Sequence, residues 1–468
     1  MTADSYLSKT PNASNRKTLT ISVWLKRSSL GSSPIFTANT DISSDASGHF
    51  AFDGDDTLHF RSWPGSSPYA FLQMTQRKFV DTTAWYHILV AQDTTQATAS
   101  NRIKIYINGV QESVKSSSTQ PAQDYDGFFN SNILHNVGRG NDAGIKFFEG
   151  QMAHFHFVDG TAYTPSTFGE TDSTTGIWKP KTNPSVTYGT NGFFLKFENS
   201  GALGTDSSGN TNTYAVSGDL KQSISTPSNK FPSFNPRGTN RDYDTAVYQL
   251  NAGHTALVTT GVTRVQPIDM CFAGGKWYWE AKIEKNNNSS TLGVYLTDAT
   301  SGKRIEQFNA DLALQTASNG GNGALSFLAG SSSLIQMGNS TTSYGTGISD
   351  GDIIMFAFDS ATGKVWTGRN GTWFNAPSTS NVGNPATGAN DSGKTLTNND
   401  NELYSFYVAG RNSDSTNRTI DINFGHGYFG TTAVASANAD GNGKGSFEYA
   451  PPSGFLALCS SNIQSSGG

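Results

Sequence analysis

Two histidines in one short segment are the first residues whose types and spacing could do chemistry. His154 and His156 lie two positions apart within residues 152–158, so in a strand they project from the same face, opposite Phe155 and Phe157. Two imidazoles in this geometry could share a zinc ion, but the sequence shows no third or fourth ligand. A polar outer face of a sheet explains the pair without a metal. We therefore predict no metal site and keep both histidines as candidate ligand-binding residues.

A loop with two aromatic residues is the second candidate. In WPGSSPYAF, residues 63–71, Trp63 and Tyr69 are flanked by Pro and Gly. Aromatic rings on rigid exposed loops can stack on the apolar faces of sugar rings. Packing of one of the two rings into the core explains the pattern at least as well. Trp63 and Tyr69 are therefore candidate ligand-binding residues, with sugar stacking and core packing both left open.

Three carboxylates gather in the turn Asp53-Gly54-Asp55-Asp56. Such a cluster could attract Ca²⁺, but calcium takes about six or more oxygen ligands, which this turn alone cannot supply. A solvated turn is the favoured interpretation, because Asp and Gly are typical turn residues. The sequence leaves calcium binding open.

No combination of residues in the sequence predicts catalysis. Retaining glucanases place two carboxylates about 5 Å apart, commonly on alternate positions of a Glu-x-Asp-x-Glu strand. The nearest spacing here is Glu280 and Glu284, with Lys282 where the middle acid would stand. A nucleophile elbow, a phosphate-binding loop and paired Cys ligands are also missing from the sequence. We therefore expect no catalytic residues, no cofactor and no enzymatic activity.

The composition predicts many short strands. The 468 residues include 50 Gly, 29 Phe and 17 Tyr, and only 15% are charged, which suits packed sheets and tight turns better than helices or disorder. A net charge of −5 and a pI near 5.9 provide no basic surface for nucleic acid or an anionic membrane. Residues 1–10 are polar and no run is long enough to cross a bilayer. We expect neither a secretory signal nor membrane insertion.

The stretch Asp352 to Phe374 organises the second half of the chain. Residues 353–358 form an unbroken apolar run, and residues 360–363 supply a turn. The return strand leads to Asn370-Gly371, a pair that tolerates positive φ at both positions of a type I′ turn. We predict a three-strand antiparallel meander whose first strand, apolar on both faces, lies at the centre of an all-β core.

Further motifs accompany the meander in a recognisable order. They are an opening strand, Gly275-Lys276-Trp277-Tyr278-Trp279-Glu280, and two closing segments, Ile422-Asn423-Phe424-Gly425 and Pro451-Pro452-Ser453-Gly454-Phe455. In this order they resemble a SPRY domain over residues 241–460, which implies a β-sandwich there. The first and last strands of that fold lie side by side, so the resemblance would bring Cys271 and Cys459 near each other. Two buried free thiols are the favoured interpretation, and their pairing is left open.

Strand patterns in the first part of the chain carry a second resemblance. Residues 18–26 alternate apolar and polar side chains, and residues 85–109 read as an apolar strand, a polar loop, an alternating strand and an Asn-Gly turn. Together with motifs between residues 149 and 165, they resemble a laminin G-like or pentraxin-like domain over residues 1–180. The resemblance implies a concanavalin A-type jelly roll.

The segment between these two parts has its own composition. Residues 181–240 are rich in Gly, Asn, Ser, Thr and Pro, with residues 193–197 as a single clear strand. Residues 203–210 resemble a turn found beside laminin G-like folds, and residues 226–236 contain a phrase that resembles virion proteins of marine bacteriophages. The combination resembles tail-fibre or other structural proteins of such phages.

The sequence therefore predicts an all-β protein with two antiparallel β-sandwich (jelly-roll) domains, residues 1–180 and 241–460. Residues 181–240 would connect them, and residues 461–468 would form a flexible tail. The resemblance implies a virion protein, assembled in the host cytoplasm, that attaches to a host-surface glycan or protein and contacts other virion proteins. A purely structural capsid or tail decoration and a glycan hydrolase remain alternatives. We expect a homo-oligomer, most simply a trimer, and no nucleic-acid partner.

Overall fold

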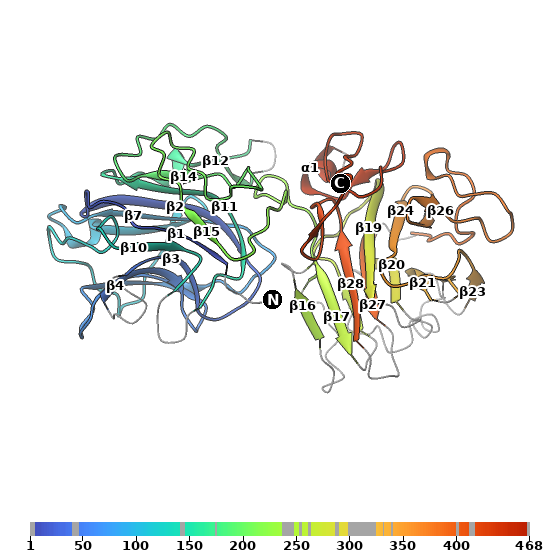
Figure 1. Ribbon diagram of the computed structural model, residues 1–468, viewed down its shortest axis with the longest axis horizontal. Coiled ribbons are helices and arrows are strands. Elements are labelled where there is room, and N and C mark those ends of the chain that lie inside the picture. Colours follow the sequence, from blue (N-terminus) through green and yellow to red (C-terminus); the bar gives the residue numbers. More distant parts are fainter. Residues whose placement is uncertain are drawn as a thin grey trace. The chain divides into compact units, whose positions relative to one another are not determined.

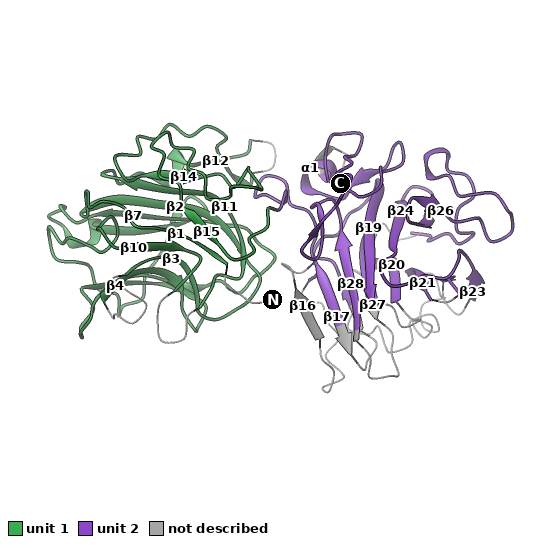
Figure 2. Cartoon of the chain, viewed as in Figure 1, with its two compact units in different colours: residues 1–222 green, residues 223–468 purple. Residues whose placement is uncertain are grey.

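Strands dominate the computed structural model, which confirms the all-β prediction (Figure 1). Contacts within the chain divide it into unit 1, residues 1–222, and unit 2, residues 223–468 (Figure 2). The structure describes residues 5–465 except 40–45, 141–145, 174–175, 236–247, 252–254, 261–263, 286–289, 298–323, 331, 338–339, 399–401 and 411–416.

Unit 1 contains two large antiparallel sheets. The seven-stranded sheet has the order β15 (Ala215–Ser217), β1 (Tyr6–Lys9), β10 (Leu134–Val137), β3 (Ser33–Asn39), β4 (Ala46–Phe52), β5 (Thr57–Pro64) and β6 (Phe71–Lys78). The six-stranded sheet has the order β14 (Phe193–Leu195), β11 (Gly150–Asp159), β2 (Thr18–Arg27), β7 (Tyr86–Asp93), β8 (Ile103–Ile107) and β9 (Val110–Gln111). A small two-stranded sheet pairs β12 (Gly169–Thr171) with β13 (Trp178–Pro180).

Alternation along the strands builds the core of unit 1. On β2, Leu19, Ile21 and Val23 are fully buried in the cluster between the sheets. The seven-stranded sheet contributes Phe36, Phe50 and Phe60 to the same cluster, and the rings of Phe36 and Phe155 meet edge to face at 5.5 Å. This is the β-sandwich that the sequence pattern predicts.

The segment assigned to a connector is partly built into this sandwich. From residues 181–222, β14 pairs with β11 at the edge of one sheet and β15 pairs with β1 at the edge of the other. Phe193 and Leu195 on β14 are buried in the core. Apolar residues of this segment complete the sheets, so the boundary between the compact units falls at residue 222, well after residue 180.

Unit 2 also contains two large sheets. The eight-stranded sheet has the order β16 (Tyr248–Asn251), β17 (Ala256–Thr260), β28 (Asn417–Asn423), β19 (Lys276–Lys285), β24 (Ile353–Asp359), β25 (Lys364–Arg369) and β26 (Thr372–Trp373), with β31 (Leu456–Ala457) also on β19. The six-stranded sheet has the order β18 (Arg264–Pro267), β27 (Leu403–Gly410), β20 (Ser290–Thr297), β21 (Ala324–Ala329), β22 (Leu334–Met337) and β23 (Ser340–Ser343). A hairpin pairs β29 (Tyr428–Phe429) with β30 (Thr432–Ala433).

The predicted meander is confirmed as β24, β25 and β26. Both residues of its second turn have positive φ, 49° at Asn370 and 85° at Gly371. On β24, Phe356 and Phe358 face the core between the sheets, while Met355 and Ala357 pack under the closing segments on the other side. The strand is buried on both faces, as its unbroken apolar run predicts.

The C-terminal residues and the two cysteines of unit 2 were also subjects of sequence predictions. Residues 460–465 form the short helix α1, whereas the sequence analysis placed a flexible tail at 461–468, of which residues 466–468 lie outside the described part. Both thiols are free and Cys459 is buried, as the favoured interpretation predicted, but Cys271 is exposed, so the expectation that both are buried is wrong for Cys271. None of the described helical segments has the length and apolar character that a membrane span requires.

Candidate functional site

The outer face of the seven-stranded sheet in unit 1 carries an unusual set of polar side chains. On β5, Leu58 and Phe60 point into the core, so His59, Arg61 and Trp63 point to the outer face. The strand register extends this face across the sheet in three rows. They are Ser8, Asn136, Thr37, His49, Arg61 and Leu72; Leu134, Asn39, Ser47 and Trp63; and Ala51, His59 and Met74.

Several of these polar side chains are buried. Asn136 is 0% exposed, and neither its amide nitrogen nor its amide oxygen has a hydrogen-bond partner in the described part of the chain. The same holds for Nε2 of His59, whose ring centroid lies 6.5 Å from that of His49. Burial, reinforced by Arg61 and His49, holds the pKa of His59 well below its usual 6.5. Unpaired buried polar atoms are costly, so Asn136 and His59 retain hydrogen-bonding capacity that the described residues leave unused.

The two predicted loop aromatics meet at the edge of these rows. The rings of Trp63 and Tyr69 lie 4.7 Å apart in an edge-to-face arrangement, and both residues are partly exposed. Arg61 Nη1 donates to the Tyr69 hydroxyl at 2.9 Å, and the guanidinium lies 5.4 Å from the centre of the same ring. We call Arg61, Trp63 and Tyr69 the aromatic corner. Residues 64–68 of the loop are exposed beside it, so neither ring is a core residue.

The predicted histidine pair lies on the other sheet and has a different role. His154 and His156 are on β11, with ring centroids 6.4 Å apart, so they do share a face. A register shift between Ala153 and His156 interrupts the strand, and His154 adopts a positive φ of 47°. This bulge is not visible in the sequence pattern.

A polar outer face, the interpretation favoured from sequence, is wrong for His156. Its ring is 2% exposed and stacks on Phe194 at 3.9 Å, and Tyr188 Oη lies 2.8 Å from its Nδ1. Burial lowers the pKa of His156 well below 6.5. The segment that follows β11 covers this face, because it brings Phe168, Tyr188 and Phe194 onto the imidazole. We assign His156 to packing rather than to ligand binding.

The acidic turn is occupied by contacts within the chain. Asp55 accepts from Thr57 Oγ1 at 2.6 Å and pairs with Lys115 at 2.9 Å. Asp56 pairs with Arg27 at 3.0 Å, and Asp53 accepts from the backbone N–H of Gly54 at 2.7 Å. No group of three or more His, Cys, Asp or Glu side chains with metal-binding geometry occurs among the described residues. Gly54 and Asp55 are exposed, in keeping with the solvated turn favoured from sequence, and the carboxylates are also held by partners within the chain.

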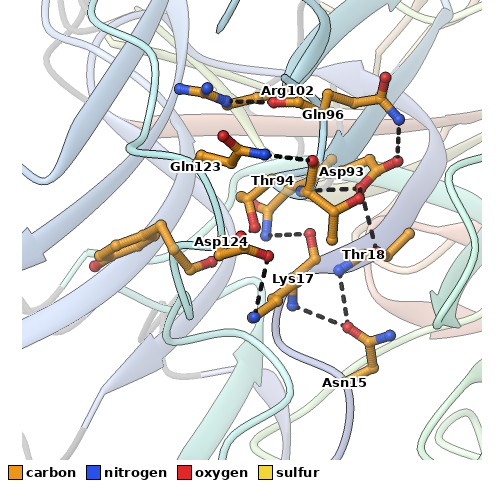
Figure 3. A network of polar contacts seen from close by, with 12 residues as sticks. Asn15, Lys17, Thr18, Asp93, Thr94, Gln96, Arg102, Gln123 and Asp124 are labelled. Atoms are coloured by element: carbon orange, nitrogen blue, oxygen red, sulfur yellow. Dashed lines mark hydrogen bonds and ion pairs between the residues drawn. The ribbon is translucent and has the colours of Figure 1, made fainter. Parts of the chain in front are cut away.

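A second polar network closes one end of the sandwich (Figure 3). Asp93 accepts from Thr95 and Gln96, both at 2.6 Å, and Arg102 donates to the backbone oxygens of Gln96, Ala97 and Pro121. Lys17 pairs with Asp124 at 3.2 Å. These groups use one another as partners and fix the loop between β7 and β8. The network therefore stabilises a chain reversal and is a weaker candidate than the outer-face rows.

Sequence reasoning missed Asn136, His49 and His59. The two histidines alternate with buried Phe50, Leu58 and Phe60, so the period-two pattern of their strands could have placed them on one face. Asn136 had no such signal, because its position depends on the pairing of β10 with β3.

Comparison with known proteins agrees with the fold of unit 1. Residues 2–167 match the family model described as the concanavalin A-like lectin/glucanases superfamily, of the laminin G type, so this part of the chain is similar to that superfamily. No curated protein matches the sequence.

Similar solved structures include three of different kinds. The SPRY domain of human HERC1 has 14% identity and a TM-score of 0.27, covering 41% of this chain and 96% of that one. Domain 4 of AbnA, an extracellular arabinanase of Geobacillus stearothermophilus solved with arabinotriose, has 22% identity and a TM-score of 0.26, covering 33% and 65%. A heptameric SAP-like pentraxin of Limulus polyphemus has 15% identity and a TM-score of 0.26, covering 34% and 71%. Likenesses with such low TM-scores carry no functional argument.

Proposed function

We propose that this protein is a non-enzymatic glycan-binding protein, and that unit 1 binds the glycan on the outer face of its seven-stranded sheet. The observation that carries the proposal is the aromatic corner on a sheet face whose longest row, Ser8, Asn136, Thr37, His49, Arg61 and Leu72, is polar except for its last residue. A sugar ring offers an apolar face for stacking and a rim of hydroxyls for hydrogen bonds. The corner supplies the rings, and Arg61 lies in the row of polar side chains that continues through His49 to Asn136.

The composition of the rows favours binding over hydrolysis. A glycosidase acting on this face would need two carboxylates within about 5 to 10 Å of each other. The three described rows contain amide, hydroxyl, imidazole and guanidinium groups and no Asp or Glu. Groups of this kind donate and accept hydrogen bonds without cleaving the glycosidic bond. Glycan hydrolysis therefore remains the less favoured alternative.

We further propose that the protein acts on the surface of a bacteriophage particle, as a tail-fibre or capsid-fibre component that attaches to the host. The resemblance of residues 226–236 to virion proteins of marine bacteriophages, together with the combination of the two domain types that resembles phage structural proteins, supports this location. Attachment by a shallow site benefits from several copies, which fits a homo-oligomer such as a trimer. A decoration protein that binds only other virion proteins is the alternative.

The test is retention of the full chain on immobilised host-surface polysaccharide, compared between the parent and two variants. Trp63→Ala removes the exposed indole of the corner. Val110→Ala is the control, because Val110 is 70% exposed on the edge strand of the other sheet. Binding by the parent and by Val110→Ala, with loss in Trp63→Ala, supports the proposal. Release of reducing ends would favour the hydrolase, and no binding to any host polysaccharide would favour the decoration protein.

A further inference from the structure

Asp421 on β28 is a buried acid that makes no side-chain hydrogen bond through Oδ1 among the described residues. Its side chain lies on the outer face of the eight-stranded sheet, the residue is 5% exposed, and Oδ1 has no hydrogen-bond partner in the described part of the chain. Gly430, in the hairpin turn between β29 and β30, closes over it, since a Cβ added there would lie 2.7 Å from Asp421 Oδ2. A buried carboxyl left unpaired in this way is costly unless it has a further role.

The residue directly opposite Asp421 is a lysine. Antiparallel pairing of β19 with β28 places Lys282 across from Asp421 and Glu280 across from Asn423. Asn423 Nδ2 donates to Glu280 Oε2 at 3.3 Å, which shows that side chains of this ladder meet on the same face. Directly opposed Cβ atoms are about 5 Å apart, a span that a lysine side chain can cross. The positive charge of Lys282 lies near enough to Asp421 to act on its pKa.

Lys282 is held by a second acid. Its Nζ lies 2.5 Å from Glu284 Oε1, two residues further along the same face of β19. The Lys282 side chain is 23% exposed and that of Glu284 is 32% exposed. An amine becomes a nucleophile when a neighbouring base takes its proton, and Glu284 is placed to do so.

We propose that Lys282 and Asp421 react to form an intramolecular amide cross-link between β19 and β28, with Glu284 as the proton acceptor. Glu284 takes a proton from the Lys282 ammonium, and the free amine attacks the Asp421 carboxyl carbon. The C–N bond forms, the C–O bond of the carboxyl breaks, and the hydroxyl leaves as water with a second proton from the amine. One ammonium, one carboxylic acid and one carboxylate become one amide, one water and one protonated Glu284. No oxidant, reductant or cofactor takes part.

The surroundings of Asp421 favour the form that this step requires. Burial, together with the nearby Glu284 carboxylate, raises the pKa of Asp421 to about 7, so the acid is substantially protonated at neutral pH. Only the protonated carboxyl can release its oxygen as water. The product amide would replace a buried charge and an unpaired oxygen with a neutral group, which removes the cost of burying them.

The cross-link would join two neighbouring strands inside one sheet. β28 lies between β17 and β19, and β19 lies between β28 and β24. A covalent bond at this point prevents separation of the opening strand of unit 2 from its closing strand. Such a bond would resist a mechanical force that separates the two strands. The cross-link proposal does not depend on glycan binding by unit 1.

Intact-mass spectrometry of the denatured full chain tests the proposal. The parent, after incubation at neutral pH, is expected to be lighter than its sequence mass by one water molecule. Proteolysis should then yield one branched peptide joining β19 to β28. Lys282→Arg keeps the positive charge but cannot form the amide under these conditions, and it should retain the full sequence mass, as should Asp421→Ala. Glu284→Gln should accumulate the lighter species at least tenfold more slowly.

Two results would overturn the cross-link. One is a parent chain that stays at its full sequence mass. The other is a loss of water that persists in Lys282→Arg, which would reveal cyclisation of Asp421 onto its own backbone. The mass and the branched peptide of the parent give a definite answer by themselves. A variant that folds poorly does not change that answer.

Discussion

Trp178 Nε1 donates a hydrogen bond to His87 Nδ1 at 2.9 Å, and this contact determines which nitrogen of the neutral imidazole carries the proton. With Nδ1 accepting, the proton of the neutral ring is on Nε2, which donates to Ser22 Oγ at 2.9 Å. The imidazole is 1% exposed and stacks on Trp24 at 4.8 Å. Trp178 belongs to β13, so a neutral His87 helps to hold the segment that covers the six-stranded sheet.

Unit 1 is expected to lose stability in acid because of this histidine. Burial, with a smaller contribution from His154, lowers the pKa of His87 from its usual 6.5 to about 3. His87 therefore binds a proton near pH 6.5 in the unfolded chain, but only near pH 3 in the folded chain. The free energy of unfolding is unaffected by this group above pH 6.5 and falls as the pH drops below it. Denaturation midpoints measured over this range should decrease, and His87→Gln should reduce the slope by about one proton.

Unit 2 is expected to respond to pH in the opposite direction through Glu280. Burial raises its pKa from 4.5 to about 7, although backbone N–H groups of Tyr449 and Glu448 and the side chains of Tyr278 and Asn423 favour the charged form. The folded chain therefore keeps a proton that the unfolded chain releases above about pH 4.5. This contribution to stability is present below pH 4.5 and is lost as the pH rises through 7.

Hydrogen exchange followed by mass spectrometry can separate the two units. Exchange rates are first corrected for the effect of pH on exchange itself. Peptides from β19 should then exchange faster at about pH 7 than at about pH 5, a range that covers most of the interval between the usual and the raised pKa of Glu280. Glu280→Gln should reduce the pH sensitivity of these peptides and leave only the contribution of Asp421, whose pKa is also raised to about 7. Peptides from β2 and β7 should keep the acid dependence set by His87. Equal pH responses in both units would contradict the opposite signs.

Trp366 is expected to be a structural residue. It is 0% exposed, its Nε1 donates to the backbone oxygen of Ala389 at 2.8 Å, and its ring meets Phe455 edge to face at 6.0 Å. Trp366→Ala should lower the free energy of unfolding by roughly 3 to 5 kcal/mol, measured by chemical denaturation. Trp373, which is only partly buried against Tyr278, should cost less on the same substitution. An unchanged midpoint for Trp366→Ala, together with lost host attachment, would instead make it a ligand residue.

Local patterns predicted the sheets better than they predicted what covers them. The alternation of β2 correctly places Leu19, Ile21 and Val23 on the core face, because the strand period decides which side chains share a face. It did not predict that the polar face of β2 is buried as well. The unbroken apolar run of β24 corresponds to the burial of both its faces. The same rule placed His154 and His156 on one face. It could not indicate that Phe168, Tyr188 and Phe194 would cover that face, since those residues come from a separate segment.

For the candidate site, too, local residue types were visible in the sequence and the contacts between strands were not. Trp63 and Tyr69 were recognisable as aromatic residues beside Pro and Gly, but the predicted loop position holds only for Tyr69, since Trp63 lies on β5. Their contact with Arg61 follows from the pairing of β5 with β6, and the row that links Arg61 to Asn136 requires three further strand pairings. No local pattern specifies those registers, so the polar rows could be recognised only after the sheet was assembled.

The aromatic corner leads to the prediction on host attachment. A sugar stacked on the corner gains about 1 kcal/mol from each ring beyond simple burial, so one site is weak. Presentation of several copies raises the apparent affinity by roughly 10² to 10⁴ without any new contact. Loss of both rings should therefore affect the assembled form far more than a single chain.

The double variant Trp63→Ala with Tyr69→Ala should fold normally, because both rings are partly exposed and lie outside the core clusters. Attachment of the assembled protein to host cells should fall at least tenfold, measured by cell-binding of labelled protein. Tyr69→Phe removes only the hydrogen bond from Arg61 and keeps the ring, so it should retain most of the attachment. If the double variant attaches as well as the parent, the corner is not the site. If the parent is monomeric and binds no host-surface extract, the adhesion proposal is wrong and a purely structural role on the particle is favoured.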